Sequence, residues 1–511
     1  MSVSNDKNLN EMKTRHIIIL SCVGIAGALS SCGKKFLTTT PVGESLQDNY
    51  YQTPAQMLTA VNAMYNPLGW EVGGTDNTYI DKLGALNCGS DECFAGGGGP
   101  TDMTTWQVFN SYTMSGAVGP QAGLWDRNYT GINRVALVLD NMSNVQGLDA
   151  ATAARYTAEG QFLRAYYYFD LVREFKNIPL ILHNLTSDQI FNQVQTTPDT
   201  IYAQIEADLN AAIPVLPPTV AASELGRATK GAAQALLGKV ILTENNTARM
   251  QEAAADLEAV NSSGLYSLLP NYADLFNPAN KFNAESIFEI VHTGAGDAGW
   301  GSWPNILGNV YAQMTGPRSY SGPVFWSGGW SFNPVSPTLA AALEGDPRYN
   351  ATIVNVDSLK AAGKASYTAG YANTGFFEAK FAPLATEVSS TGQPELNFPN
   401  DYIEIRLADT YLMEAEALVR GGGDLSKAQN YLDQVRARVG LGSIPATLDN
   451  IYNERRLELA TEGHRWFDLV RTGQAATVLA SKGFQAGVNE QLPIPLVELN
   501  NTKLKQNPGY K

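Results

Sequence analysis

Adjacent acidic residues in this chain could in principle serve general acid and base chemistry, as Asp91 and Glu92 illustrate. A glycoside hydrolase needs two carboxyl groups at a fixed separation, one of them with a raised pKa. Neighbouring Asp and Glu side chains usually diverge, so this pair does not indicate hydrolysis. The chain also contains no G-x-S-x-G, H-E-x-x-H or P-loop motif. We therefore expect a protein that is not an enzyme.

A second group of titratable residues lies near the C-terminus. On a helix, His464 and Asp468 would be neighbours four residues apart, where a structural hydrogen bond forms easily. Nearby arginines can neutralise the acidic residues of the same stretch, which favours a structural charge network over acid–base catalysis. The arginines are Arg455, Arg456 and Arg465, and the acidic residues are Glu454, Glu458 and Glu462.

The run Gly294–Gly299 matches the pattern GxGxxG, which in dinucleotide-binding proteins opens a helix. The following residues, Trp300 to Pro304, cannot begin a helix, so we interpret this run as a flexible loop. No cofactor is expected.

Aromatic residues in two loop-rich stretches give a sharper signal. A ring face on a loop can stack against the C–H face of a sugar while neighbouring polar side chains bind its hydroxyls. Half of the eight tryptophans fall between residues 300 and 330. Each ring could instead be a core residue or anchor a loop. The candidate platforms are Trp70, Tyr79 and Trp106 in the first stretch and Trp300, Trp303, Tyr320, Trp326 and Trp330 in the second.

The N-terminus resembles a bacterial lipoprotein signal. Lys13 and Arg15 precede an apolar stretch from residue 17 to 29, which is too short to span a bilayer but fits a signal peptide. It ends in Leu-Ser-Ser-Cys, a sequence similar to the lipobox in which the cysteine is acylated. We predict a signal peptide at 1–31 and lipidation at Cys32; the alternative is an ordinary signal peptide with a coincidental cysteine.

Export also bears on the remaining cysteines. Cys88 and Cys93 enclose a short loop, and in an oxidising compartment we expect them to form a disulfide. Zinc would need two more ligands, and the histidines of the mature chain, His183, His292 and His464, are not nearby in sequence. We predict no metal site.

The composition excludes other classes of function. The chain has 511 residues, of which 16% are charged, and its formal charge is −14. An acidic chain without a basic run is not expected to bind nucleic acid. Its length allows several domains or one large composite.

Helical periodicity dominates both ends of the chain, with two irregular stretches at 67–123 and 262–400. Paired helices with a short turn, such as 405–420 and 425–439, resemble tetratricopeptide units. One convincing strand is expected at 286–292. The other expected helices are 54–65, 124–141, 151–175, 200–213, 229–242, 249–261 and 450–471.

Together these segments resemble the SusD/RagB family of outer-membrane nutrient-binding lipoproteins. The similar runs follow the family's order along nearly the whole mature chain. They are Cys32–Pro41, Ala158–Leu171, Gly226–Ala233, Ile405–Ala417, Glu454–Ala460 and Gln506–Tyr510.

The resemblance implies a mainly α-helical scaffold of tetratricopeptide-like pairs, with an inserted, loop-rich subdomain that carries little β-structure and holds the ligand. It implies binding without catalysis, and a TonB-dependent (SusC-like) outer-membrane transporter as partner. Residues 90–97 resemble a loop near the family's ligand face, which adds Asp91 and Phe94 to the candidate ligand-binding residues.

We accordingly expect a signal peptide at 1–31, an N-terminal helical region at 32–261, a tryptophan-rich ligand subdomain at 262–400 and a C-terminal helical region at 401–511. The expected function is capture of an oligo- or polysaccharide for uptake; the alternative is a peptide- or glycoprotein-binding member of the same scaffold. The protein should be anchored in the outer membrane and face the exterior, although Lys34 and Lys35 stand where surface-exposed relatives often carry acidic residues.

Overall fold

The computed structural model describes residues 50–70, 72–73, 78–79, 82–297, 299–300, 306–500 and 502–510, with side chains left out at 72–73 and 78–79. The predicted signal peptide 1–31 and Cys32 lie outside the described residues. The chain divides into two units, 1–52 and 53–511, and the second contains the fold.

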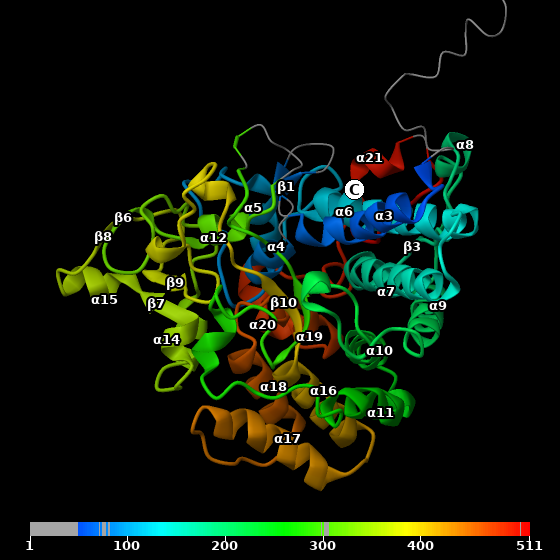
Figure 1. Ribbon diagram of the computed structural model, residues 1–511. Helices are drawn as coiled ribbons and strands as arrows, with labels where there is room; N and C mark the ends of the chain where they lie inside the picture. Colours follow the sequence, from blue (N-terminus) through cyan, green and yellow to red (C-terminus); the bar gives the residue numbers. More distant parts are fainter. Residues whose placement is uncertain are drawn as a thin grey trace, which may run out of the picture. The chain divides into compact units, whose positions relative to one another are not determined.

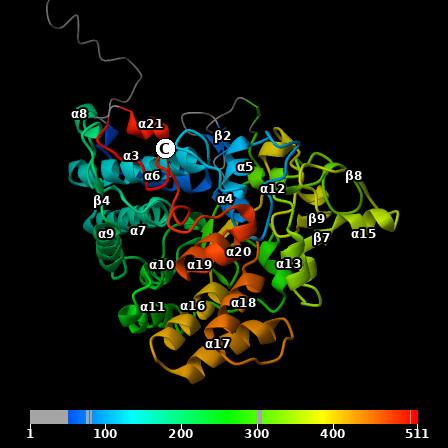
Figure 2. The ribbon, with the colours of Figure 1, turned by 180° about the vertical axis from the view of Figure 1, so that it is seen from behind.

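Unit 53–511 is mainly α-helical, as the sequence indicates. Its longer helices pack one against the next and succeed each other along one side of the unit (Figure 1), and the view from behind shows the same order (Figure 2). They are α3 (Pro54–Tyr65), α6 (Gln121–Asn141), α7 (Ala150–Phe175), α9 (Pro198–Ala212), α10 (Lys230–Glu244), α11 (Met250–Asn261), α16 (Leu407–Arg420), α17 (Leu425–Arg438) and α18 (Leu448–Glu458).

Short helices fill the rest of the unit. They are α4 (Lys82–Gly89), α5 (Thr104–Asn110), α8 (Ser187–Ile190), α12 (Val310–Thr315), α13 (Pro337–Ala342), α14 (Tyr349–Thr352), α15 (Val356–Ala361), α19 (Arg465–Arg471), α20 (Ala475–Val478) and α21 (Leu496–Leu499). Among the described helices, none has both the length and the apolar character needed to cross a membrane.

The described strands form only antiparallel pairs, so the fold carries little β-structure. The pairs are β1 (Val72–Gly73) with β2 (Thr78–Tyr79), β3 (Ile178–Pro179) with β4 (Gln195–Thr196), β5 (Ser286–Ile290) with β10 (Tyr402–Arg406), β6 (Arg318–Ser321) with β8 (Ser366–Thr368), and β7 (Ile353–Asn355) with β9 (Phe376–Glu378). The last three of these pairs lie within or border the loop-rich stretch 262–400.

Helix α7 is the centre of the N-terminal core. Its consecutive residues Tyr166, Tyr167 and Tyr168 are each at most 1% exposed. Buried hydroxyl groups need partners, and each finds one in a different element. Tyr166 donates to Glu404 Oε2 of β10 at 2.8 Å, and Tyr167 and Tyr168 donate to the carbonyls of Met64 and Ile181 at 2.7 Å. The three tyrosines therefore connect α7 to α3, to the segment after β3 and to the central strand pair.

Three sequence expectations need correction. The stretch 67–123 is not all loop, because it contains α4 and α5. The helix expected from residue 405 starts only at Leu407, because Ile405 belongs to β10. The single helix expected at 450–471 is broken between α18 and α19, where Thr461 and Gly463 have φ angles of 64° and 74°. Such left-handed backbone cannot continue an α-helix.

Candidate functional site

Two of the predicted platforms, Trp300 and Trp330, come together. Their rings stack with centroids 6.1 Å apart and planes 28° apart. Trp300 is 48% exposed and Trp330 is half-buried. This pair presents aromatic surface to solvent, which is the arrangement that stacking against a sugar requires.

The segment that carries Trp330 is firmly held. The amide of Trp330 donates to the carbonyl of Gln313 in α12 at 3.2 Å, and the amides of Ser331 and Phe332 donate to the carbonyls of Gly316 and Met314. A Cβ on Gly329 would lie only 2.3 Å from the backbone of Gly316, so the two segments pack without room for a side chain. A platform fixed in this way loses little conformational entropy when a ligand binds.

Trp326 lies on the same segment and is half-buried. Its ring covers Gly328, where a Cβ would come within 2.4 Å of the indole, and it also contacts the buried Phe398 at a centroid distance of 6.0 Å.

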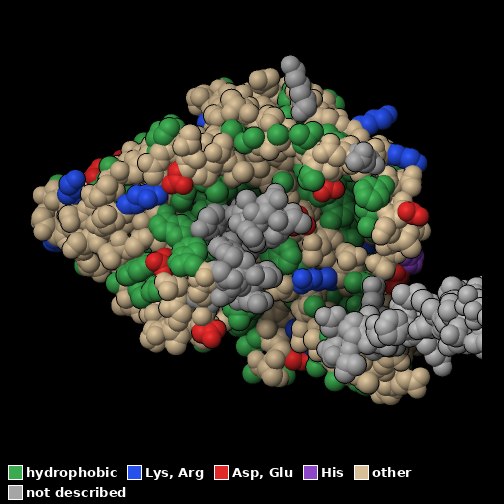
Figure 3. Space-filling view, turned by 90° about the horizontal axis from the view of Figure 1, so that it is seen from above, with side chains coloured by type: hydrophobic (Ala, Val, Ile, Leu, Met, Phe, Trp, Pro, Cys, Tyr) green, Lys and Arg blue, Asp and Glu red, His purple; other side chains and the backbone are tan. Residues whose placement is uncertain are grey.

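The face seen from above carries clusters of hydrophobic side chains near its centre and few charged ones (Figure 3).

Two other candidates prove to be core residues, so their prediction as platforms is wrong. Trp106 is 1% exposed and fits only because Gly84 has no side chain; a Cβ there would lie 2.0 Å from the indole. Tyr320 is 2% exposed and packs edge-on against Phe325. The side chains of Tyr79 and Trp303 lie outside the described residues.

Candidates in the first loop stretch have partners within the protein. The indole of Trp70 donates to Asn66 Oδ1 at 3.0 Å, and the guanidinium of Arg134 lies 5.4 Å from its ring. Phe94 is half-buried below the ammonium group of Lys482, 5.5 Å from the ring. These contacts indicate structural roles, and binding by Trp70 and Phe94 stays a prediction.

Asp91 is engaged by two arginines. Arg465 Nε approaches Asp91 Oδ1 at 2.8 Å, and Arg456 Nη2 approaches Oδ2 at 2.9 Å. Burial would raise the pKa of Asp91, but the hydrogen bond and charge of Arg465, followed by the charge of Arg456, hold that pKa below its usual value. The carboxylate thus fixes α19 to the loop after α4.

Glu92 points inward and is 1% exposed. Its Oε2 accepts a 2.9 Å hydrogen bond from the amide of Thr461, in the left-handed turn before α19. Burial, and then the charge of Asp91, raise the pKa of Glu92 to about 7. The carboxyl is therefore a structural group of the turn that has no access to solvent.

This raised pKa makes the stability contribution of Glu92 depend on pH. Because the pKa of Glu92 is raised in the folded protein, its contribution to stability is fully present below its pKa in the unfolded chain, near 4.3. That contribution is lost as the pH rises through about 7. We expect the free energy of unfolding of Glu92→Gln, relative to that of the wild type, to increase by about 2 kcal/mol from pH 5 to pH 8, measured by urea denaturation. Glu344→Gln, at an exposed position, is the control. If the free energy of unfolding of Glu92→Gln differed from that of the wild type by the same amount at both pH values, Glu92 would be ionised in the folded protein.

The expected disulfide between Cys88 and Cys93 is not formed, because both are free, buried thiols with separate partners. The thiol of Cys88 donates to the carbonyl of Ala85 at 3.3 Å, and that of Cys93 donates to Glu378 Oε1 at 3.5 Å. Instead of a covalent bond, Lys482 Nζ holds this loop by donating to the carbonyls of Cys88 and Cys93 at 2.7 and 2.8 Å.

Thiol titration checks this arrangement. Burial raises the pKa of Cys88 to about 12, and unreactive thiols are those kept from forming thiolate. A protein beginning at Gly33 should therefore give almost no reaction with a disulfide reagent when native, and two thiols per chain when unfolded without reductant. An absence of thiols after unfolding would show that the disulfide does form.

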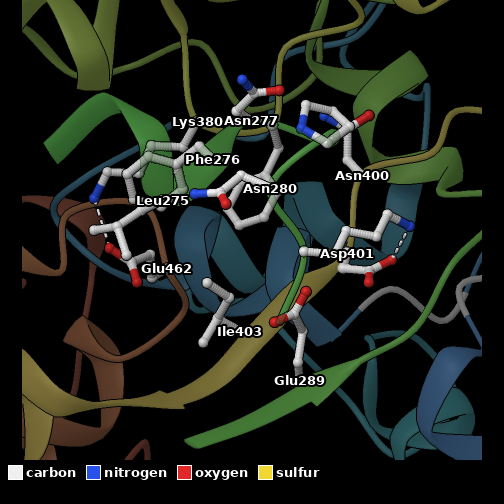
Figure 4. Close-up of a pocket in the computed structure, with 13 residues that line it drawn as sticks. Leu275, Phe276, Asn277, Asn280, Glu289, Lys380, Asn400, Asp401, Ile403 and Glu462 are labelled. Atoms are coloured by element: carbon white, nitrogen blue, oxygen red, sulfur yellow. Dashed lines mark hydrogen bonds and ion pairs between the residues drawn. The ribbon is translucent and has the colours of Figure 1, made fainter. Parts of the chain in front are cut away.

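The pocket in Figure 4 is too small for a sugar. It measures about 20 Å³, which is room for about one water molecule. Its walls include Glu289, Asp401 and the ion pair between Lys380 and Glu462, 2.7 Å apart. Among the described residues there is no group of three or more His, Cys, Asp or Glu side chains suited to a metal ion.

Comparisons with known proteins agree with this architecture. Residues 344–510 match the model of the SusD family, and residues 99–242 match a family described as starch-binding associating with outer membrane. A solved laminarin-binding SusD-like protein is 46% identical, with a TM-score of 0.85 over 90% of this chain and 100% of that one. This chain belongs to the SusD family.

Two further SusD relatives cover most of the chain. Surface glycan-binding protein A from Bacteroides thetaiotaomicron, solved in complex with laminarihexaose, is 30% identical, with a TM-score of 0.81 over 89% of this chain and 100% of that one. SusD-like protein P25 from Formosa agariphila is 27% identical over 98% of this chain and 100% of its own. The similar proteins with a named ligand are binding proteins, which agrees with the expectation that this SusD-like protein is not an enzyme.

Proposed function

We propose that this protein binds a polysaccharide of the laminarin type at the Trp300–Trp330 pair. The observation that carries the proposal is the pair itself, because its rings are stacked and partly open to solvent, and Trp330 belongs to a segment fixed by backbone hydrogen bonds. Laminarin is the favoured ligand because the 46% identical relative binds laminarin and a 30% identical one was solved with laminarihexaose.

The finer parts of the proposal concern location and delivery. Acylation of Cys32 would anchor the protein in the outer membrane, facing the exterior, and two or more acyl chains anchor stably where one does not. The bound chain would then pass to a TonB-dependent transporter. Support comes from the lipobox-like sequence and from the outer-membrane family matched at 99–242. In this proposal residues 32–261 and 401–511 form the scaffold and 262–400 the ligand subdomain.

Binding of a peptide or glycoprotein is the alternative. It would use the groove of about 710 Å³ among α7, α9, α10 and α19. That groove is lined by charges that already pair with each other, such as Arg249 with Glu206 at 2.7 Å. It also lacks an open aromatic pair, so the carbohydrate is favoured.

Isothermal titration of the protein from Gly33 tests the choice. We expect saturable heat with laminarin and laminarihexaose and micromolar to millimolar affinity, and little heat with maltohexaose, which represents starch. Heat with maltohexaose alone would be compatible with binding at the tryptophan pair, but the ligand would then be of the starch type and not of the laminarin type. Heat with peptides and with no sugar would overturn the proposal.

A further inference from the structure

Beyond the tryptophan pair, one more exposed aromatic residue adjoins the same segment. Tyr371 follows β8 and is 42% exposed. It was not singled out by the sequence analysis, because the surrounding residues Gly370 and Ala372 give no spacing signal.

Backbone hydrogen bonds place Tyr371 near Trp330. The amide of Gly97 donates to the carbonyl of Ser331 at 2.8 Å, and the amide of Tyr371 donates to the carbonyl of Gly97 at 2.7 Å. Gly97 thus binds both segments through its backbone. A Cβ on Gly370 would lie 2.7 Å from the Cβ of Ser331, so the segment with Tyr371 also packs directly against the residue that follows Trp330. One oligosaccharide can therefore reach both Trp330 and Tyr371.

An ion pair beside the turn at Gly96 and Gly97 supplies polar groups. Arg318 Nη2 lies 3.0 Å from Asp102 Oδ2, and the two side chains are 32% and 42% exposed. The amide of Gly98 also donates to Asp102 Oδ2, at 2.7 Å. Guanidinium and carboxylate groups have more donors and acceptors than one mutual contact uses, so the pair can still bind sugar hydroxyls.

Glycine keeps this surface open. Gly96 and Gly97 have φ angles of 71° and 87°, which favour glycine, and together they form the turn. A Cβ on Gly98 would lie 3.2 Å from Arg318 Nη2, whereas one on Gly99 would meet nothing within 4 Å. The ion pair and Tyr371 are thus the prominent side chains at the turn.

We propose that Tyr371, Arg318 and Asp102 form a second subsite for the carbohydrate that binds at the Trp300–Trp330 pair. It takes a neutral sugar residue further along the same chain, with Tyr371 against the ring face and the ion pair at two adjacent hydroxyls. The inference rests on the proposed function, since it concerns the same ligand. Affinity should consequently rise with the length of the oligosaccharide.

Titration of Tyr371→Ala with laminarihexaose and laminaritriose tests the subsite. We expect about a tenfold loss of affinity for the hexaose, as burial of one aromatic ring implies, and a smaller loss for the triose. Tyr371→Phe should stay within about threefold of the wild type because it keeps the ring, and Asp102→Asn should weaken the hexaose about fivefold. Phe191→Ala, which removes an aromatic ring that is 52% exposed on another part of the surface, should have no effect.

Each outcome is distinguishable. Unchanged hexaose binding by Tyr371→Ala overturns the second subsite and leaves the proposed function intact. An equal loss for the triose and the hexaose also overturns it, since Tyr371 would then act at the tryptophan pair. If the wild type binds neither ligand, the proposed function fails and the subsite fails with it.

Discussion

Replacing Trp330 with alanine is expected to weaken laminarihexaose binding about thirtyfold or more, to the limit of detection by isothermal titration. The substitution removes one ring of the stacked pair and leaves Trp300 without the partner 6.1 Å away. Central aromatic residues of a binding surface typically contribute 2 kcal/mol or more, which corresponds to this factor. The hydrogen bond from the Trp330 amide to the Gln313 carbonyl involves only backbone atoms, so the segment itself should remain in place after the substitution.

The comparison must separate binding from folding. Trp330→Ala should keep the circular dichroism spectrum and the cooperative unfolding of the wild type, since Trp330 is only half-buried. Trp330→Phe, which keeps an aromatic face, should recover part of the affinity. A folded Trp330→Ala protein that binds laminarihexaose like the wild type would mean that the ligand site lies elsewhere.

The helical scaffold could be predicted because its signals are local. Periodic apolar residues and clear stops define α3 and α7 to within one residue at each end. Strand β10 was missed because Tyr402–Arg406 continues without a break into the apolar pattern of α16, and it becomes a strand only by pairing with β5. The break at Thr461 was missed because threonine rarely has positive φ, and here the buried Glu92 holds it.

The candidate site was only partly predictable because exposure of an aromatic residue is set by distant residues. Trp106 is buried owing to Gly84, and nothing in its own neighbourhood distinguishes it from Trp300. Tyr371 and the Trp330 segment are both bound to Gly97, which lies more than 200 residues earlier in the chain. Spacing along the chain contains no record of such contacts.

The charge network near the C-terminus shows the same limit. A structural role for these charges was expected and is confirmed, but the pairing differs. Arg455 binds Asp409 at 2.6 Å and Asp468 at 3.1 Å rather than the glutamates of its own helix. Glu458 is instead bound by three arginines from other elements: Arg348 directly before α14, Arg406 at the end of β10 and Arg438 at the end of α17.

Arg406 is the centre of this network, and its replacement by alanine should give the largest loss of stability. It is 1% exposed and joins β10 to α16. Its guanidinium contacts Glu285 at 3.0 Å, Glu458 at 2.6 Å and Glu462 at 2.8 Å. Removing one member of a buried ion pair typically costs about 3–5 kcal/mol, because the remaining charge is desolvated without compensation.

We therefore expect Arg406→Ala to lower the free energy of unfolding by about 4 kcal/mol or to prevent folding, measured by urea denaturation at pH 7. Arg249→Ala is the matched control, since Arg249 also contacts three carboxylates but is 24% exposed; it should cost about 1 kcal/mol or less. Equal losses for the two variants would show that burial adds nothing to the Arg406 network.

The network also determines how the protein responds to acid. Burial would raise the pKa of Glu458, but the charges of Arg438, Arg406 and Arg348 hold it well below its usual range. Such a carboxylate contributes stability above its unfolded pKa, near 4.3, and the contribution disappears as the pH falls toward the folded value. If Arg406→Ala folds, its Glu458 pKa should be higher, so the variant should lose less stability between pH 5 and pH 3 than the wild type does. Parallel acid curves for the two proteins would contradict the assigned role of Arg406, because they would mean that its charge does not reach Glu458.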